Sequence, residues 1–141
     1  MLDLYGEAFY GYASLQRGFS PDPYMAPAVA GGEVNTAYLG FDCGFSTPVP
    51  TFSFKLGGGA SDTFLRIFFV PDDGTDTTLA IYTPDHEWLC GDDSPFGSGR
   101  DPVVDLEFAP SGDYLLWAGT WSENVFTPGT LFITQSMDTT P

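Results

Sequence analysis

Basic residues are scarce in this chain of 141 residues, and their scarcity limits its partners. Four Lys and Arg stand against 19 Asp and Glu, which gives a formal net charge of −15. A surface of that sign repels phosphate backbones, so we expect no nucleic-acid partner. It attracts divalent cations or a basic partner, although an acidic surface also serves simply to keep a β-protein soluble and monomeric.

Long apolar runs are also absent, and histidine is scarce. No run approaches the roughly 20 residues of a membrane-spanning helix, so we expect no insertion into a membrane. The single histidine, His86, lies in a predicted turn, and the chain has neither a Gly-x-Ser-x-Gly nor a His-Glu-x-x-His motif. We therefore predict no enzymatic activity. A small hydrolase is a weaker alternative, because carboxylates that suit a glycosidase pair are abundant.

Only two cysteines are present, Cys43 and Cys90, and each stands beside a glycine at the edge of a predicted strand. The simplest interpretation is a disulfide, with two buried free thiols as the alternative. A disulfide that closes a loop of this length contributes about 4 kcal/mol to stability. Because disulfides persist in oxidising compartments, this interpretation predicts a secreted protein with an extracellular or cell-surface location.

Helical periodicity is absent, whereas strand patterns recur. The composition is 43% apolar and 16% aromatic, as in a folded domain, and 17 Gly and 12 Pro are scattered along the chain. Strand-like segments follow one another at about the 8–12-residue spacing of sandwiches and barrels. We predict an all-β fold, a single-domain antiparallel β-sandwich of about eight to ten strands with a jelly-roll-like form. The predicted strands span residues 7–15, 24–29, 33–39, 51–56, 64–70, 76–83, 88–90, 102–108, 113–121 and 129–135.

A β-hairpin is predicted within residues 76–93, with its turn at residues 84–87. Pro84 and Asp85 occupy positions that a type I turn favours. A turn centred between residues 85 and 86 places Ile81 opposite Cys90. It also gathers acidic side chains at the open end of the hairpin, namely Asp76, Asp92 and Asp93.

These acidic side chains predict a calcium site, because like charges so close repel unless a cation lies among them. Calcium takes six to eight oxygen ligands at about 2.3–2.6 Å. If the loop after residue 93 folds back over the hairpin, four carboxylates can supply them: Asp76, Asp92, Asp93 and Asp101. The alternative is that these carboxylates cap turns by accepting hydrogen bonds from backbone N–H groups. Zinc is not expected, since two cysteines and one turn histidine make a poor tetrahedral set.

Aromatic side chains are the candidates for a binding surface. We select Trp121, at a strand end, with Tyr10 and Tyr12 near the N-terminus, whereas the strong alternation around Trp117 predicts that it lies in the core. Aromatic residues fall on both faces of the predicted strand at 7–15, which suggests burial on both faces. One way to achieve that is strand addition to a neighbouring subunit. The alternative is an ordinary edge strand of the same sandwich.

A series of short motifs follows along the chain in a specific order. They are GFSPDPY at 18–24, AGG at 30–32, CGF at 43–45, FSF at 52–54, LRI at 65–67, DTTL at 76–79, PD at 84–85, WLCGDD at 88–93, DP at 101–102, PSGDY at 110–114, WAGT at 117–120 and TLFIT at 130–134. In this order the chain resembles the bacterial pre-peptidase C-terminal (PPC-like) domains over about residues 15–135. The resemblance implies a jelly-roll-like β-sandwich that serves as a non-catalytic accessory module, and the two cysteines fit one branch of these domains. Some relatives bind calcium, and some bind protein or polysaccharide surfaces.

Three regions follow: an N-terminal strand at 1–14 that is a candidate for assembly, a PPC-like sandwich at 15–135 and a C-terminal tail at 136–141. We predict a non-catalytic secreted module that binds a protein or glycan surface and is stabilised by calcium. The alternative is a self-assembling subunit of an extracellular fibre or surface layer, whose partners are copies of itself joined by terminal-strand addition. The chain carries no peptidase signature, in contrast to the enzymes that carry such modules, and this raises self-assembly as an option.

Overall fold

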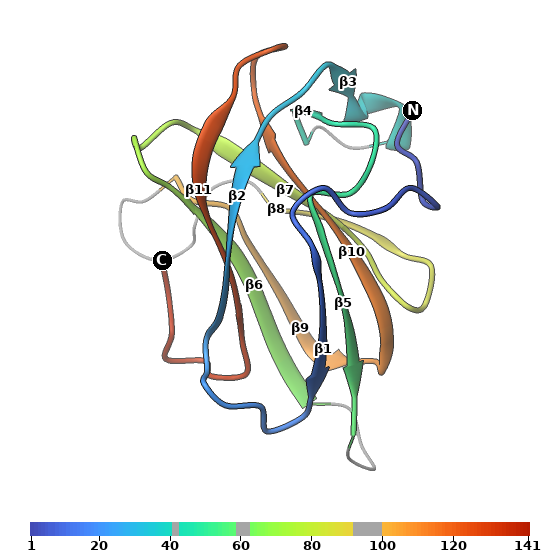
Figure 1. Cartoon of the computed structure of the whole chain (residues 1–141), viewed down its shortest axis with the longest axis vertical. Helices are drawn as coiled ribbons and strands as arrows, with labels where there is room; N and C mark the ends of the chain where they lie inside the picture. Colours follow the sequence, from blue (N-terminus) through green and yellow to red (C-terminus); the bar gives the residue numbers. More distant parts are fainter. Residues whose placement is uncertain (41–42, 59–62, 92–99) are drawn as a thin grey trace.

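The structure is a computed structural model, and it describes residues 1–40, 43–58, 63–91 and 100–141. Over these ranges the chain forms eleven β-strands and a short 3₁₀ helix, arranged as two sheets packed face to face (Figure 1). The predicted all-β sandwich is confirmed, with one strand more than expected. The weakly patterned segment 33–39 forms β3 (Val34–Asn35) and the helix η1 (Thr36–Leu39), and the additional strand is β4 (Phe45–Ser46).

The larger sheet is built around β10 (Gly112–Thr120), which pairs antiparallel with β5 on one side and β7 on the other. Strand β1 pairs parallel with β5 at one edge, and β8 pairs with β7 at the opposite edge. The short strand β4 pairs with the end of β10 and with β3. The bounds of the remaining strands are β1 (Tyr12–Gln16), β5 (Phe52–Gly57), β7 (Thr77–Tyr82) and β8 (Trp88–Gly91).

The smaller sheet is antiparallel throughout, in the order β2-β11-β6-β9. Its strands are β2 (Tyr24–Ala30), β11 (Thr127–Thr134), β6 (Thr63–Pro71) and β9 (Val103–Ala109). Buried Arg66 on β6 forms a bidentate pair with Asp105 on β9, at 2.7 and 2.9 Å. The same guanidinium donates to the carbonyls of Met137 and Thr139, so the C-terminal tail is held against this sheet.

The main core lies between the two sheets and follows the predicted alternation. Phe52, Phe54 and Leu56 of β5 are at most 3% exposed, because side chains alternate across a strand and these three face inward. On β10, Tyr114 is fully buried and stacks on Phe54 with ring centroids 4.7 Å apart. The Tyr114 hydroxyl donates to the Pro110 carbonyl at 2.6 Å, which fixes the turn that leads into β10.

A second apolar cluster, which we call the outer cluster, lies on the far face of the larger sheet. It contains Leu2, Cys43, Ala80 and Trp117. The predicted disulfide between Cys43 and Cys90 is confirmed, with a Cα–Cα distance of 5.8 Å. Trp117 is fully buried as predicted, although it faces away from the main core. The N-terminal segment and the disulfide together cover this part of the sheet.

The predicted strand at 7–15 is wrong in its first half, since β1 begins only at Tyr12. The preceding segment runs over the larger sheet, where the Asp3 amide donates to the Pro48 carbonyl at 2.7 Å. The expected burial on both faces is not found: Tyr5 is 95% exposed and Phe9 is 68% exposed. Strand β1 pairs with β5 at the edge of its own sheet, which is the alternative that the sequence left open.

The predicted hairpin forms, but its register is wrong by one residue. Ile81 lies opposite Leu89, and Cys90 lies opposite Ala80. The loop closes by a bond from the His86 amide to the Thr83 carbonyl, and His86 adopts a φ of 64°. This is a three-residue loop centred on residue 85, in which a left-handed residue follows the turn. The shift turns Cys90 toward the outer face of the larger sheet, where it meets Cys43.

Candidate functional site

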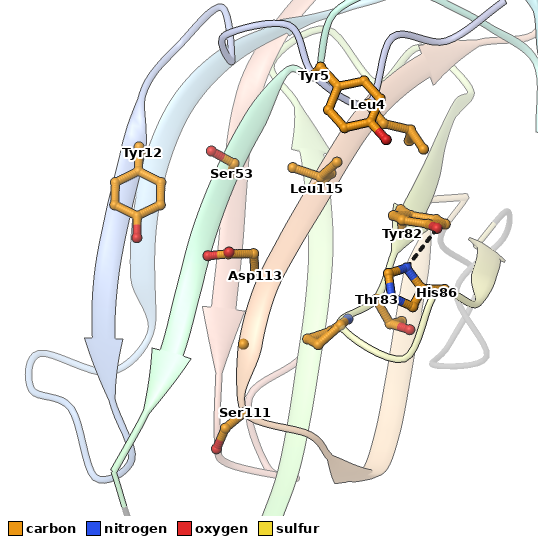
Figure 2. A pocket seen from close by; sticks show the side chains of 12 residues that line it. Leu4, Tyr5, Tyr12, Ser53, Tyr82, Thr83, His86, Ser111, Asp113 and Leu115 are labelled. Carbon is orange, nitrogen blue, oxygen red and sulfur yellow. Dashed lines mark hydrogen bonds between the residues drawn. The ribbon is translucent and has the colours of Figure 1, made fainter.

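A groove of about 780 Å³ crosses the outer face of the larger sheet beside the outer cluster (Figure 2). Its floor comes from β5 and β10, and Tyr12 on edge strand β1 forms one wall. The β7–β8 hairpin forms the opposite wall through Tyr82 and His86. Leu4 and Tyr5 of the N-terminal segment close one end. Half of the lining residues stand on paired strands, which hold the floor of the groove in a defined shape.

Strand register explains how distant residues meet in this groove. Tyr12 lies opposite Ser53, and Leu115 lies opposite both Ser53 and Tyr82. Because directly paired residues on neighbouring strands point to the same face of a sheet, these four project outward in one row across four strands. Three inter-strand steps of about 4.8 Å separate the two tyrosines along the row, or roughly 14 Å. The row therefore has an aromatic ring at each end and a polar and an apolar side chain between them.

Polar side chains line the groove next to this row. Asp113 precedes Leu115 by two residues on β10, so it shares the same face, and it lies opposite Lys55 in the register with β5. Asp113 is exposed, and Ser111 lies at the lower end of the groove in Figure 2. At the start of β10, Gly112 has a φ of 133°, and a Cβ there would lie 2.8 Å from the Pro84 side chain. Glycine is therefore required where β10 passes the hairpin.

The hairpin wall is held in place by its own contacts. The Tyr82 hydroxyl is hydrogen-bonded to His86 Nδ1 at 2.9 Å (Figure 2). The Tyr82 ring packs against Trp88 at 4.9 Å, and Trp88 packs against buried Trp117 at 5.2 Å. This chain of aromatic contacts connects the groove to the outer cluster. The opposite wall differs, because Tyr12 is 58% exposed and no ring contact of this kind holds it among the described residues.

The predicted metal ligands fall in two groups. Asp92 and Asp93 lie outside the described residues. Asp76 and Asp101 are described. One carboxylate oxygen of Asp76, Oδ1, is buried and has no hydrogen-bond partner among the described residues, which fits a ligand atom. Burial raises the pKa of Asp101. Within the described ranges, however, no group of three His, Cys, Asp or Glu side chains lies close enough to hold an ion, so calcium binding stays a prediction.

Turn capping, the alternative to metal binding, is seen at another acidic residue. The Asp73 carboxylate accepts the Thr75 amide at 3.0 Å and the Thr127 hydroxyl at 2.8 Å. These hydrogen bonds from Thr75 and Thr127 lower the pKa of Asp73 to about 2. The carboxylate thereby connects the turn after β6 to the start of β11. Neither Asp76 nor Asp101 belongs to this arrangement.

The three predicted binding residues do not gather at one place. Tyr12 lines the groove, whereas Tyr10 packs against Phe9 with centroids 4.8 Å apart and is not part of the lining. Trp121 follows the end of β10, is partly buried, and is also outside the lining. Sequence reasoning missed Tyr82 and Asp113 as site residues. The available signal was their place in alternating strands, on the face opposite the residues that pack in the main core.

Comparisons with known proteins leave the function open. No family model matches the chain, and no curated protein matches it. Among solved structures, it is similar to PliG of Aeromonas hydrophila, a periplasmic lysozyme inhibitor of g-type lysozyme, with a TM-score of 0.44 and 9% identity over 88% of this chain and 96% of that one. No functional argument is drawn from this likeness. The resemblance to pre-peptidase C-terminal domains stays a prediction.

Proposed function

We propose that the chain is a non-catalytic module of an extracellular or periplasmic compartment and that the groove is its binding site for a surface ligand. The observation that carries this proposal is the row of Tyr12, Ser53, Leu115 and Tyr82 across four paired strands. A preformed concave surface with aromatic and polar groups is the usual form of a ligand site. The disulfide supports the compartment, since such bonds persist where conditions are oxidising.

The surroundings of His86 support a binding role over catalysis. Its Nδ1 is hydrogen-bonded to the phenol of Tyr82, and its backbone stands in a tight turn. A catalytic histidine is normally oriented by a carboxylate while its other nitrogen faces the nucleophile. Here the histidine fixes the aromatic wall of the groove. Its hydrogen bond positions Tyr82 for contact with a ligand.

The docking of the N-terminal segment favours a binding module over assembly by strand donation. The amides of Asp3, Phe9 and Tyr10 donate to the carbonyls of residues 48, 50 and 51 at 2.7–2.9 Å. Leu2 is 5% exposed within the outer cluster. Donating this segment to a neighbour would break these bonds and uncover the cluster. Self-assembly is therefore the second candidate, and a stable monomer at high concentration by light scattering would count against it.

The proposal predicts that the protein co-sediments with bacterial cell-envelope fragments through the groove. The double variant Tyr12→Ala/Asp113→Ala removes one exposed ring and one exposed carboxylate, so it should stay folded and lose binding by about tenfold or more. The control Phe108→Ala removes an aromatic ring on the other sheet that is more exposed, since Phe108 is 73% exposed and Tyr12 is 58% exposed. Equal binding by the double variant and the control would contradict the groove assignment. Release of soluble products from the fragments would indicate an enzyme instead.

Calcium binding is a secondary part of the proposal, supported by the unpartnered Asp76 oxygen. At 100 times its dissociation constant, calcium should add about 2.7 kcal/mol to the free energy of unfolding, seen as a higher melting temperature than in EDTA. Asp76→Asn should abolish this difference. Asp72→Asn, an exposed carboxylate in the same turn, should leave it intact. Identical melting of the parent protein in calcium and in EDTA would remove the metal from the proposal.

A further inference from the structure

We propose that the ligand of the groove is an uncharged glycan chain; this inference rests on the proposed function and specifies its ligand. The first argument is the pair of tyrosines at the ends of the outward row. An aromatic face carries negative charge density, and the C–H groups on the flat side of a sugar ring complement it. Tyr12 can offer such a face, since the residue is 58% exposed. Between the tyrosines, Ser53 and Asp113 can bond to sugar hydroxyls.

The second argument is charge, which disfavours acidic glycans. The residues that line the groove include Asp113 but neither Lys nor Arg, and the adjoining hairpin turn carries Asp85 and Glu87. Two basic side chains adjoin the groove. Lys55 lies opposite Asp113 by register, and Arg17 donates to Ser111 Oγ at 2.9 Å, although its guanidinium also donates to the Ala109 carbonyl and the Thr63 hydroxyl. On a chain of net charge −15, a polymer of uronic acids, sulfates or phosphates would be repelled. A neutral chain avoids this repulsion and still uses the hydroxyl and carboxylate groups.

The third argument is shape, which separates a glycan from a peptide. The floor is the face of a sheet, and its strands β5 and β10 already pair with neighbours on both sides. A peptide therefore finds no free backbone edge in the groove to extend the sheet. The distance of roughly 14 Å between the tyrosines exceeds one sugar ring. An oligosaccharide laid across the strands spans it. It can stack on the exposed Tyr12 at one end, and at the other end it meets the partly buried Tyr82, which packs against Trp88.

The test uses affinity electrophoresis of the intact protein in gels that contain soluble neutral polysaccharides: a β-glucan, an α-glucan, a mannan and a xylan without acidic substituents. Polygalacturonate serves as the acidic comparison. We expect at least one neutral polymer to retard the protein and 0.5 M NaCl to leave the retardation unchanged, since no ion pair is involved. Tyr12→Ala should weaken the interaction about tenfold. Tyr12→Phe should stay within about threefold of the parent, because the stacking face remains.

Each result supports the inference or overturns it. Failure of all four neutral polymers to retard the protein, or retardation by polygalacturonate alone, overturns it. Equal effects of Tyr12→Ala and the control Phe108→Ala also overturn it. If envelope fragments still bind through the groove but lose binding after protease treatment, the ligand is a protein: the glycan inference fails and the proposed function stands. If the groove variants leave envelope binding unchanged, both fail.

Discussion

The double variant Cys43→Ala/Cys90→Ala is expected to lower the free energy of unfolding by about 4 kcal/mol. The two cysteines are 47 residues apart, so the bridge removes a large amount of loop entropy from the unfolded chain. Within the described residues, β8 pairs with β7 alone, and the bridge supplies a covalent link from this edge strand to the segment before β4. Urea unfolding of the parent and the double variant at pH 7 measures the loss.

Reduction provides the matched control for this prediction. Unfolding the parent protein in the presence of a reductant should reproduce most of the loss, whereas the double variant should respond little, because it has no bridge to break. A double variant with the unfolding midpoint of the parent would show that packing around Cys43, only 1% exposed, holds β8 without the bridge. Such a result would also weaken the argument from the disulfide to an oxidising compartment.

Much of the fold could be predicted because alternation records which face of a strand is buried. On β5, Phe52, Phe54 and Leu56 alternate and face the main core, and the apolar residues on both sides of β10 match the burial of both its faces. The hairpin register could not be assigned in this way. It depends on His86 adopting a φ of 64°, and histidine gives no signal of a left-handed conformation comparable to that of glycine. Because of this one-residue shift, Cys90 pairs with Ala80 on the outer face of the sheet, whereas the predicted register paired it with Ile81 on the inner face.

The groove could not be predicted because its residues meet only through the order of strands in the sheet. Tyr12 and Ser53 are neighbours because β1 pairs parallel with β5, and a parallel edge strand has no hairpin signal in the sequence. The N-terminal segment was misjudged for a similar reason. Its aromatic residues satisfy a strand pattern, but the chain there docks by single backbone bonds to residues 48–51. The sequence pattern of a strand indicates which of its faces is apolar. The strand it pairs with determines which side chains lie next to that face.

Trp117→Ala is expected to lower the free energy of unfolding by about 3–5 kcal/mol, the range for removal of a buried aromatic side chain. The indole is fully buried in the outer cluster and packs against Trp88 at 5.2 Å. Its Nε1 donates to the Pro48 carbonyl at 3.3 Å, and the Asp3 amide donates to the same oxygen. The substitution therefore opens a cavity under the N-terminal segment and removes a bond beside its anchor.

The position of this cavity gives the prediction a second, local consequence. Because Leu2 packs in the same cluster, and Leu4 and Tyr5 close one end of the groove, Trp117→Ala should expose the first residues to limited proteolysis and weaken ligand binding. The matched control is Trp121→Ala, which removes a partly buried indole outside the groove and should cost about 1 kcal/mol or less. Equal losses of stability for the two variants would mean that the outer cluster contributes no more than an ordinary surface contact. A Trp117→Ala protein that is destabilised but keeps its N-terminus protected would place the cavity away from the groove, and ligand affinity should then equal that of the parent.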